Sequence, residues 1–254
     1  SNAWFASYWT DAAQRDLWER HPQNLMAGTV MPTGQCESVD GGFLLSGRWP
    51  FASNCENAQW LFVSAVAPAP VQAPAASAAM PGPTGLLPFQ ERFPDRFFDV
   101  GIAEQHAVTG AAGMAMGGLR PIVAVYSTFL NRAWDQVVYD VALHRLPVIF
   151  CLDRAGITGP DGASHHGVYD MALMSKVPGM RVFAPSSAQE LAQMLHDAIN
   201  LVDEGPIAIR YARGAARQVG EHEVGEGFHA RHVVSSDDAE VCIIAVGKML
   251  EIAE

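Results

Sequence analysis

The sequence of 254 residues is poor in basic residues, with 16 Lys and Arg against 27 Asp and Glu and a net charge of −11. It contains no run rich in Lys and Arg, which argues against a nucleic-acid or anionic-membrane surface because phosphate binding needs clustered positive charge. We also expect no signal peptide, and the sequence contains no apolar run long enough to span a bilayer. We therefore expect no nucleic-acid partner and no membrane partner.

Cysteine is scarce and scattered. No CxxC pair and no Cys/His ligand spacing accompanies the four cysteines, Cys36, Cys55, Cys151 and Cys242. This usage argues against a structural zinc site and favours a reducing, cytoplasmic location. With 49% hydrophobic and 17% charged residues, the composition is that of a globular protein.

One composition shift divides the chain. The Ala/Pro-rich, uncharged segment 67–83 is predicted to be a linker or junction. Residues 1–66 predict a helix followed by short antiparallel strands. In 84–236, strands and helices alternate, which predicts an α/β domain with a mostly parallel sheet covered by helices. Residues 237–254 predict a buried strand and a helix start, which we expect to be the truncated beginning of a further domain.

Ligands of parallel sheets bind at the carboxyl ends of the strands. The polar residues expected there are Tyr126, Ser127, Asp153, Arg154, Arg210 and Arg213. A lone arginine is more often solvated or salt-bridged than functional. Several arginines at the strand ends of one sheet favour an anionic ligand such as a phosphate or a carboxylate.

Glu104 is the one carboxylate between Gly101 and Leu119, in the stretch "GIAEQHAVTGAAGMAMGGL". Burying a charge is costly unless it is paired or protonated. Two interpretations stay open. Glu104 is either a helix-start carboxylate stabilised by the helix dipole, or a poised acid that shares a proton with a ligand nitrogen.

The Gly-rich stretch "DRAGITGPDGASHHG", residues 153–167, follows a strand of nearly continuous apolar residues. Loops of this length in compact domains are usually functional, although a surface loop with ordinary turn residues would look similar. The loop contains Arg154, Asp161, His165 and His166. No carboxylate stands at ligand spacing from the two histidines, so an acid/base or hydrogen-bonding histidine is favoured over a metal ligand.

From about residue 78 to residue 254 the chain closely resembles the 1-deoxy-D-xylulose-5-phosphate synthases, thiamine-diphosphate enzymes related to transketolase. The matching stretches are "AAMPGPTGL", "FPDRFFDVGIAEQHAVT", "YSTFLNRAWDQ", "LDRAGITGPDGASHHG", "VPGM", "APSS" and "RYARG". The resemblance covers the pyrimidine-binding domain. It implies a cytoplasmic, homodimeric transferase of isoprenoid precursor biosynthesis that condenses pyruvate with glyceraldehyde 3-phosphate.

The resemblance also implies roles for individual residues. Glu104 should hydrogen-bond the aminopyrimidine ring of thiamine diphosphate and share a proton with it, as a catalytic residue together with His165. Phe129 and Arg132 should contact the cofactor. The substrates should be bound by Tyr126, Arg154, Asp161 and Arg213, with the two arginines on the phosphate. The GDG motif that holds the diphosphate and Mg²⁺ in this family does not occur here, so we expect no metal ligands in this chain and little or no activity from it alone.

Residues from about 5 to 68 resemble part of a flavin-dependent monooxygenase of the acyl-CoA dehydrogenase fold, through "QRDLW" and "VDGGFLLSGRWPFASNCENAQWLFV". The resemblance implies that Phe51 and Ser53 approach a flavin. The alternative, which we favour, is that Trp49, Phe51 and Trp60 are core aromatic residues of a small β-segment. A non-catalytic fusion of two unrelated pieces, or a subunit whose partner supplies the GDG half, would also fit the sequence.

Overall fold

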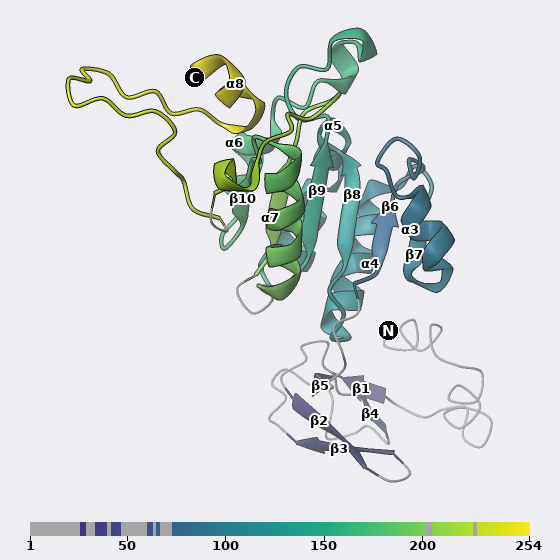
Figure 1. The fold of residues 1–254 in the computed structure, drawn as a ribbon. Helices are drawn as coiled ribbons and strands as arrows, with labels where there is room; N and C mark the ends of the chain where they lie inside the picture. The colour runs from purple at the N-terminus through teal and green to yellow at the C-terminus, as the bar shows by residue number, and fades with distance from the viewer. Residues whose placement is uncertain are drawn as a thin grey trace. The chain divides into compact units, whose positions relative to one another are not determined.

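The computed structural model describes residues 26–28, 34–39, 42–46, 60–62, 65–66, 73–201, 205–225 and 228–254. The chain divides into two compact units near residue 70. Figure 1 shows the fold of each unit. No helix among the described residues is long and apolar enough to cross a membrane.

The described residues of the first unit form five short strands. They are β1 (Met26–Gly28), β2 (Gly34–Val39), β3 (Gly42–Ser46), β4 (Trp60–Phe62) and β5 (Ala65–Val66). Strands β2 and β3 are antiparallel, whereas β1 pairs with β4 and β2 pairs with β5 in parallel. Strands β4 and β5, in the stretch that the sequence predicts to be antiparallel, therefore pair in parallel. The predicted N-terminal helix and the proposed flavin contacts at Phe51 and Ser53 lie outside the described residues.

The second unit is built on a six-stranded sheet in which every pairing is parallel. The strands lie in the order β10-β11-β9-β8-β6-β7. They are β6 (Ala75–Ser77), β7 (Phe97–Asp99), β8 (Ile122–Tyr126), β9 (Ile149–Asp153), β10 (Arg181–Phe183) and β11 (Ile207–Arg210). The predicted α/β class with a mostly parallel sheet is therefore confirmed.

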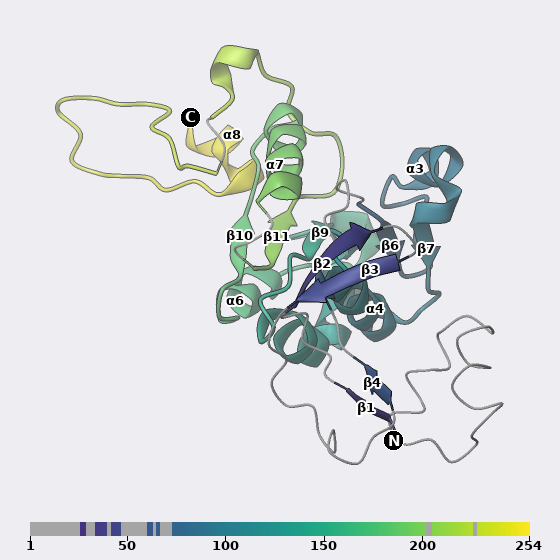
Figure 2. The ribbon, with the colours of Figure 1, turned by 90° about the horizontal axis from the view of Figure 1, so that it is seen from below.

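Helices cover both faces of this sheet, with α7 on one face and α4 and α6 on the other (Figures 1 and 2). The α-helices are α3 (Leu87–Arg92), α4 (Glu104–Met116), α5 (Ser127–Leu130), α6 (Asp170–Met174), α7 (Ala188–Asn200) and α8 (Leu250–Ala253). A π-helix spans Gln136–Ala142. The 3₁₀ turns are Pro94–Arg96, Asn131–Ala133, Gly159–Asp161, Ala163–His165, Glu221–Glu223 and Gly247–Met249.

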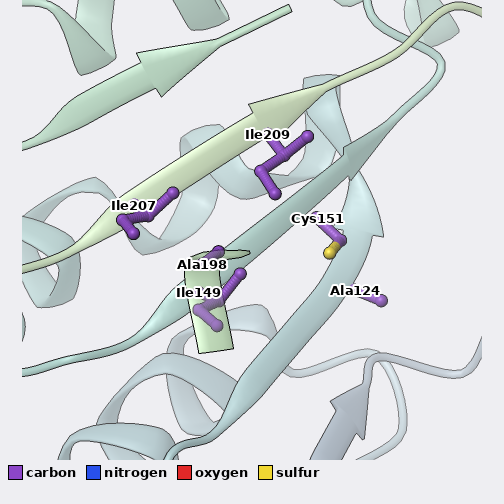
Figure 3. Close-up of a cluster of buried hydrophobic side chains, with 6 residues drawn as sticks. All are labelled: Ala124, Ile149, Cys151, Ala198, Ile207 and Ile209. Carbon is purple, nitrogen blue, oxygen red and sulfur yellow. The ribbon is translucent and has the colours of Figure 1, made fainter. Parts of the chain in front are cut away.

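The core beneath α7 follows from strand periodicity. Alternate residues of β9 and β11 point to the same face, where they meet Ala124 of β8 and Ala198 of α7 (Figure 3). Phe150 and Leu152 alternate with Ile149 and Cys151 along β9, so they point to the opposite face, and both are fully buried. Burial on both faces explains why the sequence of β9 is a continuous apolar run rather than an alternating one.

The stretch "SAQELAQMLHDAINLV" predicts a helix capped by Ser186 or Ser187, and α7 begins there with Ser187 as its cap. The hydroxyl of Ser187 accepts a hydrogen bond from the backbone N–H of Glu190 at 3.1 Å. The Glu190 carboxylate accepts hydrogen bonds from the backbone N–H and the hydroxyl of Ser186, each at 2.7 Å. These bonds satisfy polar groups at the helix start that would otherwise lack partners.

The structure differs from the sequence-based expectations at two segments. Strand β6 lies inside segment 67–83, which the sequence predicts as a linker, and its three residues are almost fully buried between β7 and β8. Alanine and serine have little intrinsic preference for strands, so only the tertiary environment reveals this one. The predicted strand in "EVCIIAVG", residues 240–247, is not formed, and Val241, Ile243 and Ile244 are exposed.

Candidate active site

The parallel register brings the carboxyl ends of β8 and β9 together. Tyr126, the last residue of β8, lies opposite Asp153, the last residue of β9. Arg154 follows with a positive φ of 58°, a left-handed conformation that is costly for a residue with a side chain. This turn places the Arg154 guanidinium 3.9 Å from the centre of the Tyr126 ring. Sheet register and backbone turn together therefore produce a cation–π contact at the strand ends.

Asp153 holds Arg154 in this conformation. Its carboxylate accepts a hydrogen bond from the Arg154 backbone N–H at 2.6 Å and another from the guanidinium at 2.7 Å. Asp153 is buried, and burial raises its pKa although the adjacent Arg154 opposes the shift. The sequence marks Asp153 only as a polar residue at a strand end. Its contact with Arg154 depends on the backbone conformation of Arg154, which no spacing pattern reveals.

Asp161 joins two arginines from different elements. Its Oδ2 lies 3.0 Å from Nε of Arg154 and 2.9 Å from Nε of Arg213, which follows β11. Partial desolvation raises the pKa of Asp161, but the hydrogen bonds and charges of the two arginines outweigh it and lower the pKa overall. Two guanidinium groups directed at one oxyanion show that this end of the sheet accommodates negative charge.

An aromatic cluster lies beside this ionic group. The rings of Tyr126 and Phe129 stack with centroids 5.6 Å apart. The ring of His165 lies edge-on to both, at 5.4 Å from Phe129 and 6.3 Å from Tyr126. Burial raises the pKa of the Tyr126 hydroxyl, and Arg154 partly offsets the shift. The hydroxyl of Ser164 lies 3.0 Å from Nδ1 of His165.

Glu104 is both a helix-start residue and a buried one. It is the first residue of α4 and is 3% exposed. Its Oε2 lies 3.4 Å from the guanidinium of Arg132, whose side chain is 52% exposed. Arg132 also lies over the ring of Phe129, at 5.6 Å. The buried acid is therefore connected through one arginine to the aromatic cluster.

The eight residues to which the family resemblance assigns roles are linked by contacts in the structure. One series of contacts runs from Glu104 through Arg132 to Phe129, and a second runs from Tyr126 through Arg154 and Asp161 to Arg213, with His165 against both rings. We name this set the strand-end cluster. Two other candidates face elsewhere. Arg210 pairs with the buried Asp170 at 2.8 Å, and Nδ1 of His166 lies 2.9 Å from the hydroxyl of Thr158.

The donor set of the cluster fits one half of a thiamine site. A buried carboxylate that is connected through Arg132 to an aromatic ring suits a flat, nitrogen-containing ring. The buried Ser127 hydroxyl has no hydrogen-bond partner among the described residues. The same part of the chain contains no group of three or more His, Cys, Asp or Glu residues arranged to hold a metal ion. The cluster therefore offers ligands for an organic ring and for an anion.

Comparison with protein families shows which family the second unit belongs to. The family model described as the transketolase pyrimidine-binding domain matches residues 64–218. The chain belongs to this family. The match includes all eight residues of the strand-end cluster, so the chain carries the site within the domain that defines its lineage.

Among curated relatives, the chain is similar to 1-deoxy-D-xylulose-5-phosphate synthases, as its motifs predict. It is 58% identical over 189 residues to the synthase of Mycobacteroides abscessus, covering 70% of this chain and 28% of that protein. It is 62% identical over 177 residues to the synthase of Mycolicibacterium vanbaalenii, covering 70% of this chain and 26% of the relative. The chain thus spans between a quarter and a third of the length of these relatives.

Solved structures agree with the assignment. A split-gene transketolase described as an inactive β4 tetramer is 31% identical, with a TM-score of 0.52 over 60% of this chain and 48% of that one. A transketolase variant from Pichia stipitis has a TM-score of 0.61 over 71% of this chain and 29% of its own, at 20% identity. The second likeness supports the fold alone.

Proposed function

We propose that this chain supplies the pyrimidine-binding half of a 1-deoxy-D-xylulose-5-phosphate synthase, a thiamine-diphosphate-dependent transferase that condenses pyruvate with glyceraldehyde 3-phosphate. The observation that carries the proposal is the strand-end cluster, which connects a buried glutamate to the two arginines paired with Asp161, within a domain 58% identical to such a synthase. A cytoplasmic location follows from the same assignment and from the scattered cysteines.

The cofactor's aminopyrimidine would be held by Glu104, Phe129 and Arg132. Burial of Glu104 strengthens a hydrogen bond from its carboxyl group to a ring nitrogen, because the local dielectric is low. The Phe129 ring offers a flat apolar face, and Arg132 keeps the glutamate oriented through the 3.4 Å contact. When bound, thiamine diphosphate supplies a nucleophilic carbon and stores the electrons released on decarboxylation.

The substrates would lie against the other side of the cluster. Arg154 and Arg213 are placed to hold the phosphate of the aldehyde, since both already contact the Asp161 carboxylate. Tyr126 and His165 offer a hydroxyl and an imidazole beside the aromatic pair, where they can hydrogen-bond or move a proton at a substrate oxygen. Asp161 sets the positions of both arginines.

We further propose that the site is completed by another chain or domain. No GDG motif for the diphosphate and Mg²⁺ occurs in the sequence, so the missing half must come from elsewhere. The split-gene transketolase provides a precedent, since its name describes a tetramer of one subunit type that is inactive. Low activity of the isolated chain follows from this proposal, whereas homodimer formation is proposed from the resemblance to the synthase family.

Binding of thiamine diphosphate with Mg²⁺, measured by calorimetry, tests the proposal. We expect weak or no binding to the chain alone and saturable binding after a chain bearing the GDG half is added. In the reconstituted enzyme, Glu104→Ala should abolish turnover while leaving the far-UV circular dichroism unchanged, whereas Glu91→Ala, at an exposed glutamate, should be neutral. Normal turnover with Glu104→Ala would remove Glu104 from the chemistry. No cofactor binding under any condition would instead favour a non-catalytic chain.

The phosphate site is tested separately with Arg213→Ala in the same reconstituted enzyme. Losing one charge-assisted hydrogen bond costs about 1.5–3 kcal/mol, so the KM for the phosphorylated aldehyde should rise roughly 10- to 100-fold. The KM for pyruvate should change little. Lys176→Ala, at an exposed cation, is the charge-matched control. An unchanged requirement for the aldehyde would move the phosphate to another arginine.

A further inference from the structure

The two consecutive histidines of the Gly-rich loop have different surroundings. His165 lies against the rings of Phe129 and Tyr126. His166 contacts the loop itself: its Nδ1 accepts a hydrogen bond from the backbone N–H of Thr158 at 3.1 Å and lies 2.9 Å from the Thr158 hydroxyl. Thr158 is 3% exposed, so this contact is within the base of the loop rather than on its surface.

These partners fix the chemical state of His166. A backbone N–H can only donate, so Nδ1 must carry a lone pair, which leaves the proton of a neutral ring on Nε2. A proton on Nδ1 would point at the Thr158 N–H and break the bond. The observed contact therefore requires the neutral Nε2–H tautomer of His166.

The loop is closed at its base next to this contact. Gly156 and Gly167 exchange two backbone hydrogen bonds, at 2.8 and 2.9 Å. Gly167 has no free space, because a Cβ atom there would lie 2.5 Å from Oγ of Ser127 and 2.6 Å from the carbonyl oxygen of Arg154. The contact between Thr158 and His166 is the next one across the loop, further from its base than the Gly156–Gly167 pair. Residues 159–165, which include Asp161 and His165, are thus held between two ends that are both tied down.

We infer that His166 is a positioning residue, which acts as a hydrogen-bond acceptor to hold the loop so that His165 rests against the Tyr126–Phe129 pair. His166 touches neither ring and acts through its neighbour. Only the relevance of His166 to catalysis rests on the proposed function. The contacts that hold the loop are present in the chain without any ligand. Of the two interpretations that the sequence left open for the histidine pair, acid/base and hydrogen-bonding, the inference assigns His166 the hydrogen-bonding one and names Thr158 as the partner.

The test uses the full chain, free of ligand, labelled with ¹⁵N-histidine. Long-range ¹H–¹⁵N spectra should show His166 as the Nε2–H tautomer, its signal being identified by its loss in His166→Asn. In His166→Ala, the nuclear Overhauser contacts between His165 and Phe129 should disappear, and exchange of the Thr158 amide should accelerate by about tenfold, as loss of one buried hydrogen bond predicts. His166→Asn should restore both, because its Oδ1 offers an acceptor close to the position of Nδ1.

Two results would overturn the inference. The first is a neutral His166 with its proton on Nδ1 in the native chain, a measurement that needs no variant to fold. The second is unchanged contacts of His165 in His166→Ala, or a failure of His166→Asn to restore them. Neither result bears on cofactor or phosphate binding, so failure of this inference is distinguishable from failure of the proposed function.

Discussion

Gly167→Ala probes the closure of the Gly-rich loop with a single methyl group. The new Cβ would lie 2.5 Å from Oγ of Ser127 and 2.6 Å from the backbone oxygen of Arg154, about 1 Å closer than ordinary van der Waals contact. Side-chain rotation cannot relieve this overlap, since the Arg154 oxygen is backbone and the Cβ of Ser127, which rotation leaves in place, also lies 2.6 Å from the new atom. Overpacking a rigid site costs about 1–3 kcal/mol, and we expect the upper end of that range here.

Urea unfolding followed by far-UV circular dichroism measures this cost. With an m-value of about 2 kcal/mol/M, the midpoint should fall by about 1 M or more. Gly113→Ala is the matched control, since nothing lies within 4 Å of its added Cβ and its site is an exposed position in α4. Alanine at that helical position should stabilise the chain by roughly 0.5–1 kcal/mol. An unfolding midpoint for Gly167→Ala equal to that of the native chain, with unchanged amide exchange at Gly156, would refute the reasoning.

Three further predictions concern other parts of the second unit. Ser187→Ala removes the hydroxyl that caps α7 and should lower the free energy of unfolding by about 1 kcal/mol in the same urea assay, and a change near zero would contradict the capping role. The fold lowers the pKa of Asp161, so its ion pairs stabilise the chain above the pKa of an unfolded carboxyl, and this stabilisation is lost as the pH falls through the folded pKa. The free energies of unfolding of the native and Asp161→Asn chains should therefore converge on acidification. Parallel pH profiles of the two chains would contradict the ion pairs. Burial raises the pKa of Cys151 to about 12, so peptide mapping after brief thiol labelling of the folded chain should find Cys242 modified and Cys151 unmodified, and early labelling of Cys151 would contradict its burial.

The sequence predicts the elements whose local pattern agrees with their final surroundings. The continuous apolar run of β9 indicates a strand buried on both faces, and Phe150 and Cys151 are both buried. Ser187 and Glu190 mark the start of α7 because a capping interaction depends only on residues three positions apart.

The contacts of the site were not predictable in the same way. Arg132 contacts Glu104, 28 residues away in the sequence. Arg213 is further in sequence from Asp161, and the two can pair only because β11 lies beside β9. Family motifs indicated that these residues share a site, but the ion pairs that connect them depend on strand order. Strand order is not encoded in any local pattern, since it follows from how the helices cover the sheet.

Strand β6 has a practical consequence for how this chain should be trimmed. It is the neighbour of both β7 and β8, so β7 joins the rest of the sheet through those three small residues. Asp99, at the end of β7, also binds the backbone N–H groups of Ala79 and Gly101 just ahead of Glu104. A shortened chain that starts at residue 84, where composition suggests the domain begins, would lack β6 and the Asp99–Ala79 hydrogen bond, and the segment before Glu104 would lose these contacts. A chain that starts ahead of residue 73 would retain them.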